Sequence, residues 1–266
     1  MRFLFDLYRK LVCRPIFFRL NTVLFQLSLR GLGILNYEND KISGEWYLIH
    51  KLLPKKIGTD RPILFDVGAN VGNYSASLLG SFPRGFIHAF EPHPGNYARL
   101  LEKAVAGNMK CHNMAVGESK GSLTLYDRAD HNGSAHASLH EAVISELHGQ
   151  KVVAHEVSVE TLDEIAEREG VEFIDYLKID TEGNEFAVLK GASRLLREER
   201  IGCIHFEFNE MNIISRVFFR DFRKILHRYD LYRLLPSGLL LLRDFPLETE
   251  LFAYQNIFAV PKAKKR

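Results

Sequence analysis

From residue 62 onward, short apolar runs alternate with segments in which apolar residues recur every three or four positions. Short apolar runs predict buried strands, and the three-to-four spacing predicts amphipathic helices. The predicted strands cover residues 63–67, 86–90, 109–116, 152–157, 173–179 and 202–206. The predicted helices between them cover residues 71–79, 96–105, 161–168 and 185–196. This alternation indicates an α/β fold with a mostly parallel, doubly wound sheet.

The remainder of the chain adds a helix, three strands and one inserted arm. Residues 217–228 have the helical spacing, and closing strands are predicted over residues 231–235, 239–242 and 255–260. Residues 122–126 alternate apolar and polar side chains, which predicts a hairpin arm. The sequence contains no internal repeat and no low-complexity linker. We therefore expect one domain over residues 61–266, preceded by a helical extension over residues 1–60.

The first 30 residues are rich in Phe and Leu, with basic side chains interleaved. Their apolar residues recur at helical spacing on both sides of Pro15, which predicts two helical pieces. Such a segment can lie on an anionic membrane surface with its aromatic side chains in the lipid. It can equally pack against the domain or form a homo-oligomer with a second subunit. We favour packing or oligomerisation over peripheral membrane contact, because apolar stripes usually bury in protein.

Composition and charge narrow the class of protein. Apolar residues make up 46% of the chain and charged residues 26%, which is typical of globular proteins. The net charge of +2 argues against nucleic-acid binding as the main activity. Cys13, Cys111 and Cys203 lie far apart, so they predict neither a disulfide framework nor a thiolate zinc site.

These features also bear on location. The cysteine pattern favours a reducing, cytoplasmic compartment. No apolar stretch approaches the roughly 18 residues that span a bilayer. The first 30 residues lack the small-residue cleavage site of a secretory signal. Any membrane contact is therefore expected to be peripheral, at the inner face.

The passage over residues 63–73 joins the first predicted strand to its helix through two glycines. It reads Ile-Leu-Phe-Asp-Val-Gly-Ala-Asn-Val-Gly-Asn, with Asp66 near the strand end and Gly68 and Gly72 bracketing the turn. Glycine permits a ligand to approach the main chain closely, and a helix N-terminus offers unpaired N–H donors. The passage favours a nucleotide-like ligand, although an ordinary turn can also hold two glycines.

Acidic residues lie at the carboxyl ends of four of the predicted strands, namely Asp66, Glu91, Asp180 and Glu207. The carboxyl ends of parallel strands meet at one edge of the sheet, where ligands bind in open α/β folds. We therefore expect the four side chains to line that edge. Glu91 lies 19 residues beyond Gly72, where an acid can accept both hydroxyl groups of a ribose.

Two adenosine cofactors compete for such a site, a nicotinamide dinucleotide and S-adenosylmethionine. A dinucleotide site needs Gly-x-Gly-x-x-Gly, and this loop lacks the third glycine. Asp66 would also repel a pyrophosphate, whereas it would attract the ammonium of an amino acid. The residues favour S-adenosylmethionine. A nicotinamide-dependent oxidoreductase and a non-catalytic binding module are the alternatives.

Several segments occur in an order typical of one enzyme family, and together they cover roughly residues 44–210. They are Phe-Asp-Val-Gly-Ala-Asn-Val-Gly-Asn-Tyr-Ser (65–75), Phe-Glu-Pro (90–92), Asn-Met-Ala-Val-Gly (113–117), Glu-Thr-Leu-Asp-Glu (160–164), Leu-Lys-Ile-Asp-Thr-Glu-Gly (177–183), Val-Leu-Lys-Gly-Ala (188–192) and His-Phe-Glu (205–207). In these segments the chain resembles the FkbM family of class I S-adenosylmethionine-dependent methyltransferases. The resemblance implies a Rossmann-like, seven-stranded sheet with an antiparallel last strand. It also implies O-methylation of a hydroxyl on a sugar, a glycan or a natural product.

The resemblance further implies which residues contact the cofactor. The residues around its methionine part would be Asp66, Gly68, Asn70 and Gly72. Glu91 would hold the ribose, and the residues that border the adenine would be Asn113, Ala115 and Val116. One departure is Asn184, where many members have His. If that side chain touches the substrate, the departure affects acceptor choice.

A hydroxyl acceptor must lose its proton around the transition state, so a base or an orienting group is expected. The candidates are Asp180, Glu182 and Glu207. Asp180 is the first choice, because the end of the fourth strand faces the transferred methyl group in this fold class. Its alternative roles are to cap the next helix or to bind the methionine ammonium. In a variant mechanism, Mg²⁺ lies between Asp180 and Glu207.

Histidines are concentrated in the polar segment over residues 127–150. They are His131, His136, His140 and His148. The four-residue spacing of His136 and His140 occurs in zinc pairs, but no thiolate and no zincin pattern accompanies it, so we expect no metal site. We expect instead a lid over the acceptor pocket, hinged at Gly133. His88 and His205 lie within strands and are predicted to be hydrogen-bonded core residues.

Overall fold

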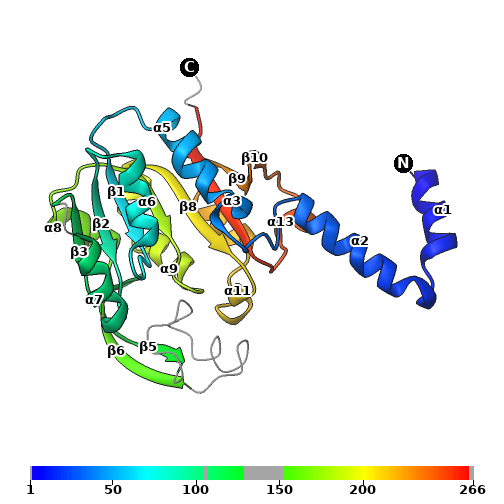
Figure 1. Cartoon of the computed structure of the whole chain (residues 1–266), viewed down its shortest axis with the longest axis horizontal. Coiled ribbons are helices and arrows are strands. Elements are labelled where there is room, and N and C mark those ends of the chain that lie inside the picture. The colour runs from blue at the N-terminus through cyan, green and yellow to red at the C-terminus, as the bar shows by residue number, and fades with distance from the viewer. Residues whose placement is uncertain (1, 105–106, 129–151, 264–266) are drawn as a thin grey trace.

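The computed structural model describes residues 2–104, 107–128 and 152–263 (Figure 1). Its main sheet has eight strands. In spatial order they are β10 (Gly238–Leu241), β9 (Tyr229–Leu235), β11 (Gln255–Pro261), β8 (Ile201–Phe208), β7 (Ile174–Ile179), β1 (Ile63–Val67), β2 (Phe86–Phe90) and β3 (Met109–His112). The strands from β8 to β3 run parallel, and β11 is antiparallel to β8 and β9. This confirms the predicted Rossmann-like sheet, to which β10 adds an eighth strand paired with β9.

Apolar side chains alternate along the central strands and supply a core on each face of the sheet. On β1, Phe65 belongs to one buried cluster and Leu64 to the other, because successive side chains of a strand point to opposite faces. The helices on the Phe65 face are α8 (Leu162–Arg168), α9 (Glu185–Lys190), α10 (Ser193–Arg197) and α12 (Phe219–Ile225). On the Leu64 face lie the π-type turn η2 (Leu48–Leu52), α5 (Leu53–Lys56), α6 (Asn73–Ser81) and α7 (Pro94–Lys103). The predicted doubly wound architecture is confirmed.

A second, three-stranded sheet lies below the main sheet in the view of Figure 1. Its strands are β4 (Ala115–Val116), β6 (Val152–Glu160) and β5 (Gly121–Arg128). β5 and β6 pair antiparallel, which confirms the predicted hairpin arm. The single strand predicted over residues 109–116 is wrong, because β3 pairs with β2 whereas β4 pairs with β6. The side chain of Asn113 stabilises the break, since its Nδ2 donates to the carbonyl oxygen of Glu91 at 2.9 Å.

The helix predicted over residues 185–196 is also divided, into α9 and α10. Between them, Gly191 lies against Gly117, and a Cβ on Gly191 would be only 2.0 Å from the carbonyl oxygen of Gly117. This close approach requires glycine at the division. Two short helices were not predicted from the sequence, α11 (Met211–Ile214) and α13 (Pro246–Thr249).

The N-terminal helices project away from the sheet (Figure 1). They are α1 (Arg2–Val12), the 3₁₀ turn η1 (Pro15–Phe17) and α2 (Phe18–Gly31), which confirms the predicted pair broken at Pro15. α1 buries no residue and α2 buries only Leu29, so the expected packing of this segment against its own domain is not observed. Within the described residues, every helix is too short or too polar to cross a bilayer.

The segment that follows α2 returns to the domain. It contains α3 (Asp40–Ser43), α4 (Glu45–Tyr47), η2 and α5. Leu48 and Leu53 are fully buried in the same cluster as Leu64 of β1. The domain boundary at residue 60 stays a prediction, and this packing favours a boundary nearer to the end of α2.

Candidate functional site

The loop between β1 and α6 is fastened to the ends of two neighbouring strands. The backbone N–H groups of Gly68 and Ala69 donate to the carbonyl oxygen of Phe90 at 3.0 and 2.9 Å. Gly68 has a φ of 80°, and a Cβ there would lie 1.7 Å from the carbonyl oxygen of Asp180. A side chain at this position would therefore overlap the backbone after β7. Backbone contact is thus one reason for glycine here, separate from any approach of a ligand.

A pocket opens next to this loop, at the carboxyl ends of β1, β2 and β7. Its apolar walls include Val67, Phe90, Met114 and Leu125. The predicted cofactor residues that line it are Gly68, Asn70, Glu91, Ala115 and Val116. The predicted residues that do not line it are Asp66, Gly72 and Asn113.

Glu91 is held in place by the backbone around the pocket. Its Oε2 accepts from the N–H of Asn70, and its Oε1 accepts from the N–H of His93, each at 2.8 Å. The side chain is nearly completely buried. Burial raises the pKa of Glu91 to about 7, against the opposite effect of the two N–H donors. The carboxyl group is therefore fixed in orientation and titrates near neutral pH.

Two asparagines support the part of the pocket formed by β4. Asn113 donates to the carbonyl oxygens of Glu91 and Pro92, at 2.9 and 3.1 Å. Its amide therefore stabilises the backbone of the pocket wall without lining the pocket. Asn184 lines the pocket and donates through Nδ2 to the carbonyl oxygen of Val116 at 3.1 Å. Asn184, which the sequence reading connected with acceptor choice, therefore lies at the pocket wall.

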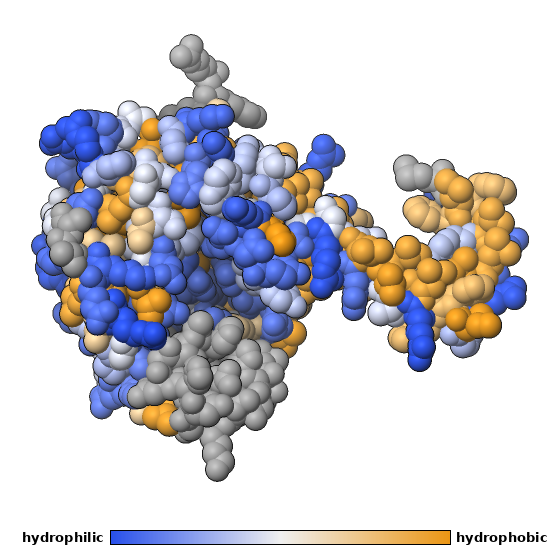
Figure 2. All heavy atoms as spheres, viewed as in Figure 1, coloured by the Kyte–Doolittle hydropathy of each residue, from blue (hydrophilic) through white to orange (hydrophobic). Residues whose placement is uncertain are grey.

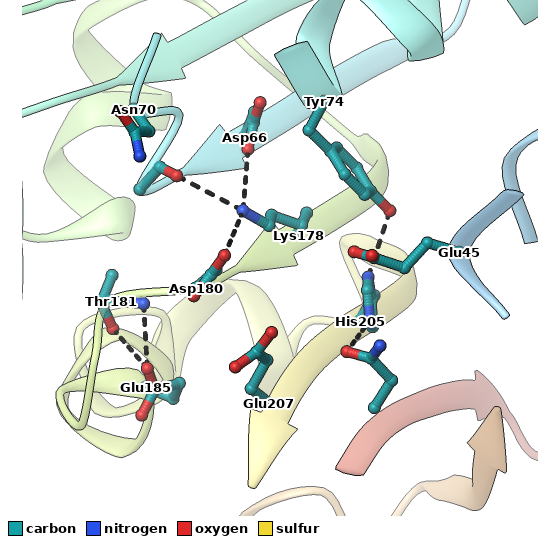
Figure 3. A network of polar contacts seen from close by, with 12 residues as sticks. Glu45, Asp66, Asn70, Tyr74, Lys178, Asp180, Thr181, Glu185, His205 and Glu207 are labelled. Carbon is teal, nitrogen blue, oxygen red and sulfur yellow. Dashed lines mark hydrogen bonds and ion pairs between the residues drawn. The ribbon is translucent and has the colours of Figure 1, made fainter. Parts of the chain in front are cut away.

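A buried lysine connects the glycine loop to the end of β7 (Figure 3). The Nζ of Lys178 lies 3.0 Å from Asp180 Oδ2 and 3.6 Å from Asp66 Oδ1, and it donates to the carbonyl oxygen of Gly68 at 3.3 Å. Burial alone would lower the pKa of Lys178, but Asp180 and Asp66 outweigh this effect and raise it. Asp66 is fully buried, and its Oδ2 accepts from Ser75 Oγ at 2.6 Å. Asp66 thus faces Lys178 and Ser75 rather than the pocket.

The three predicted catalytic carboxylates come together at the end of β7. Asp180 and Glu182 line the pocket, whereas Glu207 of β8 is not among its lining residues and lies near Asp180 in Figure 3. Burial raises the pKa of Glu207 well above its ordinary value, and the charges of Asp180, Glu182 and Glu45 raise it further. Glu45 comes from α4, and burial raises its pKa as well. This site therefore combines one buried ammonium with a group of mutually repelling carboxylates.

A chain of hydrogen bonds runs beside Glu207, between α6 and β11. The hydroxyl groups of Tyr176 and Tyr74 lie 2.6 Å apart, and Tyr74 lies 3.1 Å from His205 Nδ1. His205 Nε2 lies 2.9 Å from the side-chain oxygen of Asn256. Because that oxygen only accepts, Nε2 carries the proton and Nδ1 accepts from Tyr74. Burial lowers the pKa of His205 to about 4, so the ring is neutral at neutral pH.

The two strand histidines are hydrogen-bonded core residues, as predicted. His205 is bonded at both ring nitrogens, and His88 Nδ1 lies 3.1 Å from His112 Nε2. Both side chains are buried.

The Methyltransferase FkbM domain family matches residues 66–234, which is more than half of the chain. The chain belongs to the FkbM methyltransferase family. It is 23% identical to the 2-O-methyltransferase NoeI of Sinorhizobium fredii over 71% of this chain and 81% of that protein. It is 29% identical to the 31-O-demethyl-FK506 methyltransferase FkbM of Streptomyces tacrolimicus over 48% of this chain and 58% of that protein.

One further relative and one solved structure are also similar to this chain. Methyltransferase 1 of Beauveria bassiana is 26% identical to this chain. The aligned part covers 50% of this chain and 59% of the length of that relative. The crystal structure of a methyltransferase FkbM from Methylobacillus flagellatus aligns with a TM-score of 0.45 at 14% identity, over 80% of this chain and 49% of that one.

Sequence reasoning missed two residues that shape the site of this FkbM domain. Lys178 lies in β7 two positions before Asp180, which directly follows the strand, and this spacing puts both side chains on one side and could have indicated the pair. Glu185 is buried, and its Oε1 accepts from the N–H groups of Thr181 and Gly183 at 2.9 and 3.1 Å. Glu185 therefore fixes the loop that carries Asp180 to the pocket.

No group of three or more His, Cys, Asp or Glu side chains is arranged to hold a metal ion within the described ranges. The four histidines of the polar segment and Gly133 lie outside those ranges. The lid hinged at Gly133 stays a prediction.

Proposed function

We propose that this chain is an S-adenosylmethionine-dependent O-methyltransferase that acts on a hydroxyl of a sugar, a glycan or a natural product. The names of two relatives specify O-methyl transfer, and one of them acts on a derivative of FK506. The observation that carries the proposal is that one pocket joins the glycine loop and Glu91 to the carboxylates of Asp180 and Glu182. A cofactor seated against Glu91 would have its reactive end within reach of those carboxylates.

We assign the ribose of the cofactor to Glu91. Each of its oxygens accepts one backbone N–H and keeps a second lone pair, which can accept a ribose hydroxyl. Phe90, Val116 and Leu125 supply apolar surface for the adenine. Asp66 acts indirectly, because it holds Lys178 beneath the loop.

When bound, S-adenosylmethionine supplies an electrophilic methyl group, so the protein has to align the acceptor and take its proton. The carboxylate of Asp180 is already paired with the ammonium of Lys178, which lies 3.0 Å from its Oδ2 and holds it in place. Glu207 lies near Asp180 in Figure 3, and burial together with the charges of the neighbouring carboxylates raises its pKa, so it binds a proton more readily than an ordinary glutamate. We therefore assign proton removal to Glu207, and orientation of the acceptor hydroxyl to Asp180 with Glu182. This revises the first choice made from the sequence.

The alternatives are less well supported. Family membership favours methyl transfer over a nicotinamide-dependent oxidation. Mg²⁺ between Asp180 and Glu207 is disfavoured, because the ammonium of Lys178 already lies 3.0 Å from Asp180. A non-catalytic binding module would keep the pocket but transfer nothing.

The test is transfer of tritiated methyl groups from S-adenosylmethionine into an extract of the source cells, with mass spectrometry of the labelled product. We expect a labelled methyl ether from the wild type. Glu207→Gln should lose most transfer while cofactor affinity is kept, and Glu210→Gln, which changes an exposed carboxylate three residues away, is the matched control. Label on nitrogen would contradict O-methylation, and cofactor binding without transfer to any acceptor would support the binding module.

A further inference from the structure

Helices α1 and α2 expose an unusual amount of apolar surface. The most exposed large apolar side chains on α1 and η1 are Phe3, Leu4, Phe5 and Ile16, with relative exposures from 64% to 83%. On α2, Phe18, Phe25 and Leu27 are 59% to 70% exposed. Figure 2 shows these hydrophobic residues gathered over the projecting N-terminal segment. An apolar patch of this kind on a protein surface marks an interaction site.

The arrangement of side chains on α1 separates the two kinds of residue. The polar side chains Arg2, Asp6, Arg9 and Lys10 fall at positions that share one face of a helix. The apolar residues from Phe3 to Leu11 occupy the remaining, wider face. Such a helix can lie in a membrane interface, with its apolar face in the lipid and its basic side chains reaching the headgroups.

Side-chain hydrogen bonds fix α1 relative to α2. The hydroxyl of Tyr8 donates to Asn21 Oδ1 at 2.5 Å, and Asn21 Nδ2 donates to the carbonyl oxygen of Val12 at 3.1 Å. The two helices are therefore joined across the turn at Pro15 and form one structural unit, which we call the N-terminal arm (residues 2–31).

The charge of the N-terminal arm identifies its partner. It carries six basic side chains, Arg2, Arg9, Lys10, Arg14, Arg19 and Arg30, and one acidic side chain, Asp6. Because the whole chain carries a net charge of +2, the arm carries +5 and the remainder of the chain −3. Two arms packed against each other would bring like charges together, whereas an anionic lipid surface is complementary to the arm.

We propose that the N-terminal arm is a membrane-binding element that lies in the interface of an anionic bilayer and holds the methyltransferase domain at the membrane surface. The apolar side chains of α1, η1 and α2 enter the headgroup region, and the basic side chains contact lipid phosphates. The remainder of the chain, with a net charge of −3, has no comparable net attraction to an anionic surface.

The experiment is co-sedimentation of the full chain with two kinds of vesicle, pure phosphatidylcholine and phosphatidylcholine mixed with phosphatidylglycerol. We expect the chain to sediment with the mixed vesicles and much less with the neutral ones. Arg9→Gln with Lys10→Gln should lower the partition coefficient by roughly tenfold or more. Lys55→Gln with Lys56→Gln removes the same charge from an exposed site on α5 and should leave partitioning unchanged.

A second variant separates lipid binding from self-association. Leu4→Ser with Leu7→Ser should also abolish sedimentation, while light scattering in the absence of vesicles shows the same mass as the wild type. Failure of the wild type to sediment with the mixed vesicles would overturn the proposal. So would equal sedimentation with neutral vesicles, or a solution dimer that the leucine variant converts to a monomer. Cofactor affinity, which reports on the proposed function, should be equal in all of these variants.

Discussion

The pocket edge of the sheet buries charged side chains, whereas the N-terminal arm exposes apolar ones. At the edge, the charged groups of Asp66 and Lys178 are enclosed and paired with each other. In the arm, Phe3, Phe18 and other apolar groups face outward. A buried charge is stable only with its partner, so the edge should tolerate few changes. Exposed apolar groups contribute little to folding, so the arm should tolerate many changes that affect only association.

The largest expected effect is on Lys178. Lys178→Met leaves Asp66 as a buried charge without its partner, so the free energy of unfolding should fall by about 3–5 kcal/mol. Urea denaturation measures the change. The control is Lys190→Met, which breaks an exposed ion pair with Glu118 and should cost less than about 1 kcal/mol. Equal losses of stability from the two substitutions would contradict the claim that the buried ion pair at the edge matters more than an exposed one.

The next effect concerns the glycine loop. Gly68→Ala places a Cβ 1.7 Å from the carbonyl oxygen of Asp180, so the loop or the end of β7 must move. We expect a loss of stability of about 2 kcal/mol or more and weaker binding of S-adenosylmethionine. Gly80→Ala is the control, because Gly80 lies in α6 with open space around it and should be neutral or stabilising. Unchanged cofactor affinity in Gly68→Ala would show that Gly68 has no role in binding the cofactor.

A smaller and more specific effect concerns the ionisation of Glu91. A ribose hydroxyl donates to the carboxylate, so a proton competes with the ligand for the same oxygens. Because the pKa of Glu91 is about 7, cofactor affinity should fall as the pH drops below 7, by up to roughly tenfold per pH unit. Calorimetry of Glu91→Gln should show weaker and pH-independent binding. Glu102→Gln, on the exposed side of α7, should keep the wild-type profile, and a flat profile in the wild type would contradict the ribose assignment.

The smallest effect is expected from removing the arm. Deletion of residues 1–27 keeps Leu29, which is the buried residue of α2. The free energy of unfolding should change by less than about 1 kcal/mol, and cofactor affinity should not change, because none of the described residues in the deleted stretch is buried. Urea denaturation and calorimetry measure both quantities. A cooperative loss of stability would show that the arm belongs to the folding unit.

The sheet could be predicted from the sequence because its determinants are local. The period of apolar residues identified β1, β2, β7 and β8 as buried strands, and parallel strands place the acids that follow them at one edge. Gathering of Asp180, Glu182 and Glu207 follows from that topology alone. The break between β3 and β4 could not be predicted, because it depends on a contact of Asn113 with a residue of another strand.

The contacts between side chains within the site also could not be predicted from the sequence. From the sequence we expected Asp66 to lie beside the ligand. In the structure its carboxylate contacts Lys178 and Ser75. The role of Lys178 requires knowledge of which strand neighbours β1. The sequence singled out Gly68 for the approach of a ligand, whereas the contact with Asp180 that requires glycine there joins residues more than a hundred positions apart.

The most direct measurement is hydrogen–deuterium exchange of the full chain with and without S-adenosylmethionine. Binding at the proposed pocket predicts slower exchange at the amides of Asn70 and His93, which Glu91 holds, and at residues 114–116. Exchange in α1 and α2 should stay the same. Absence of protection around Glu91, or protection confined to the N-terminal arm, would contradict the account.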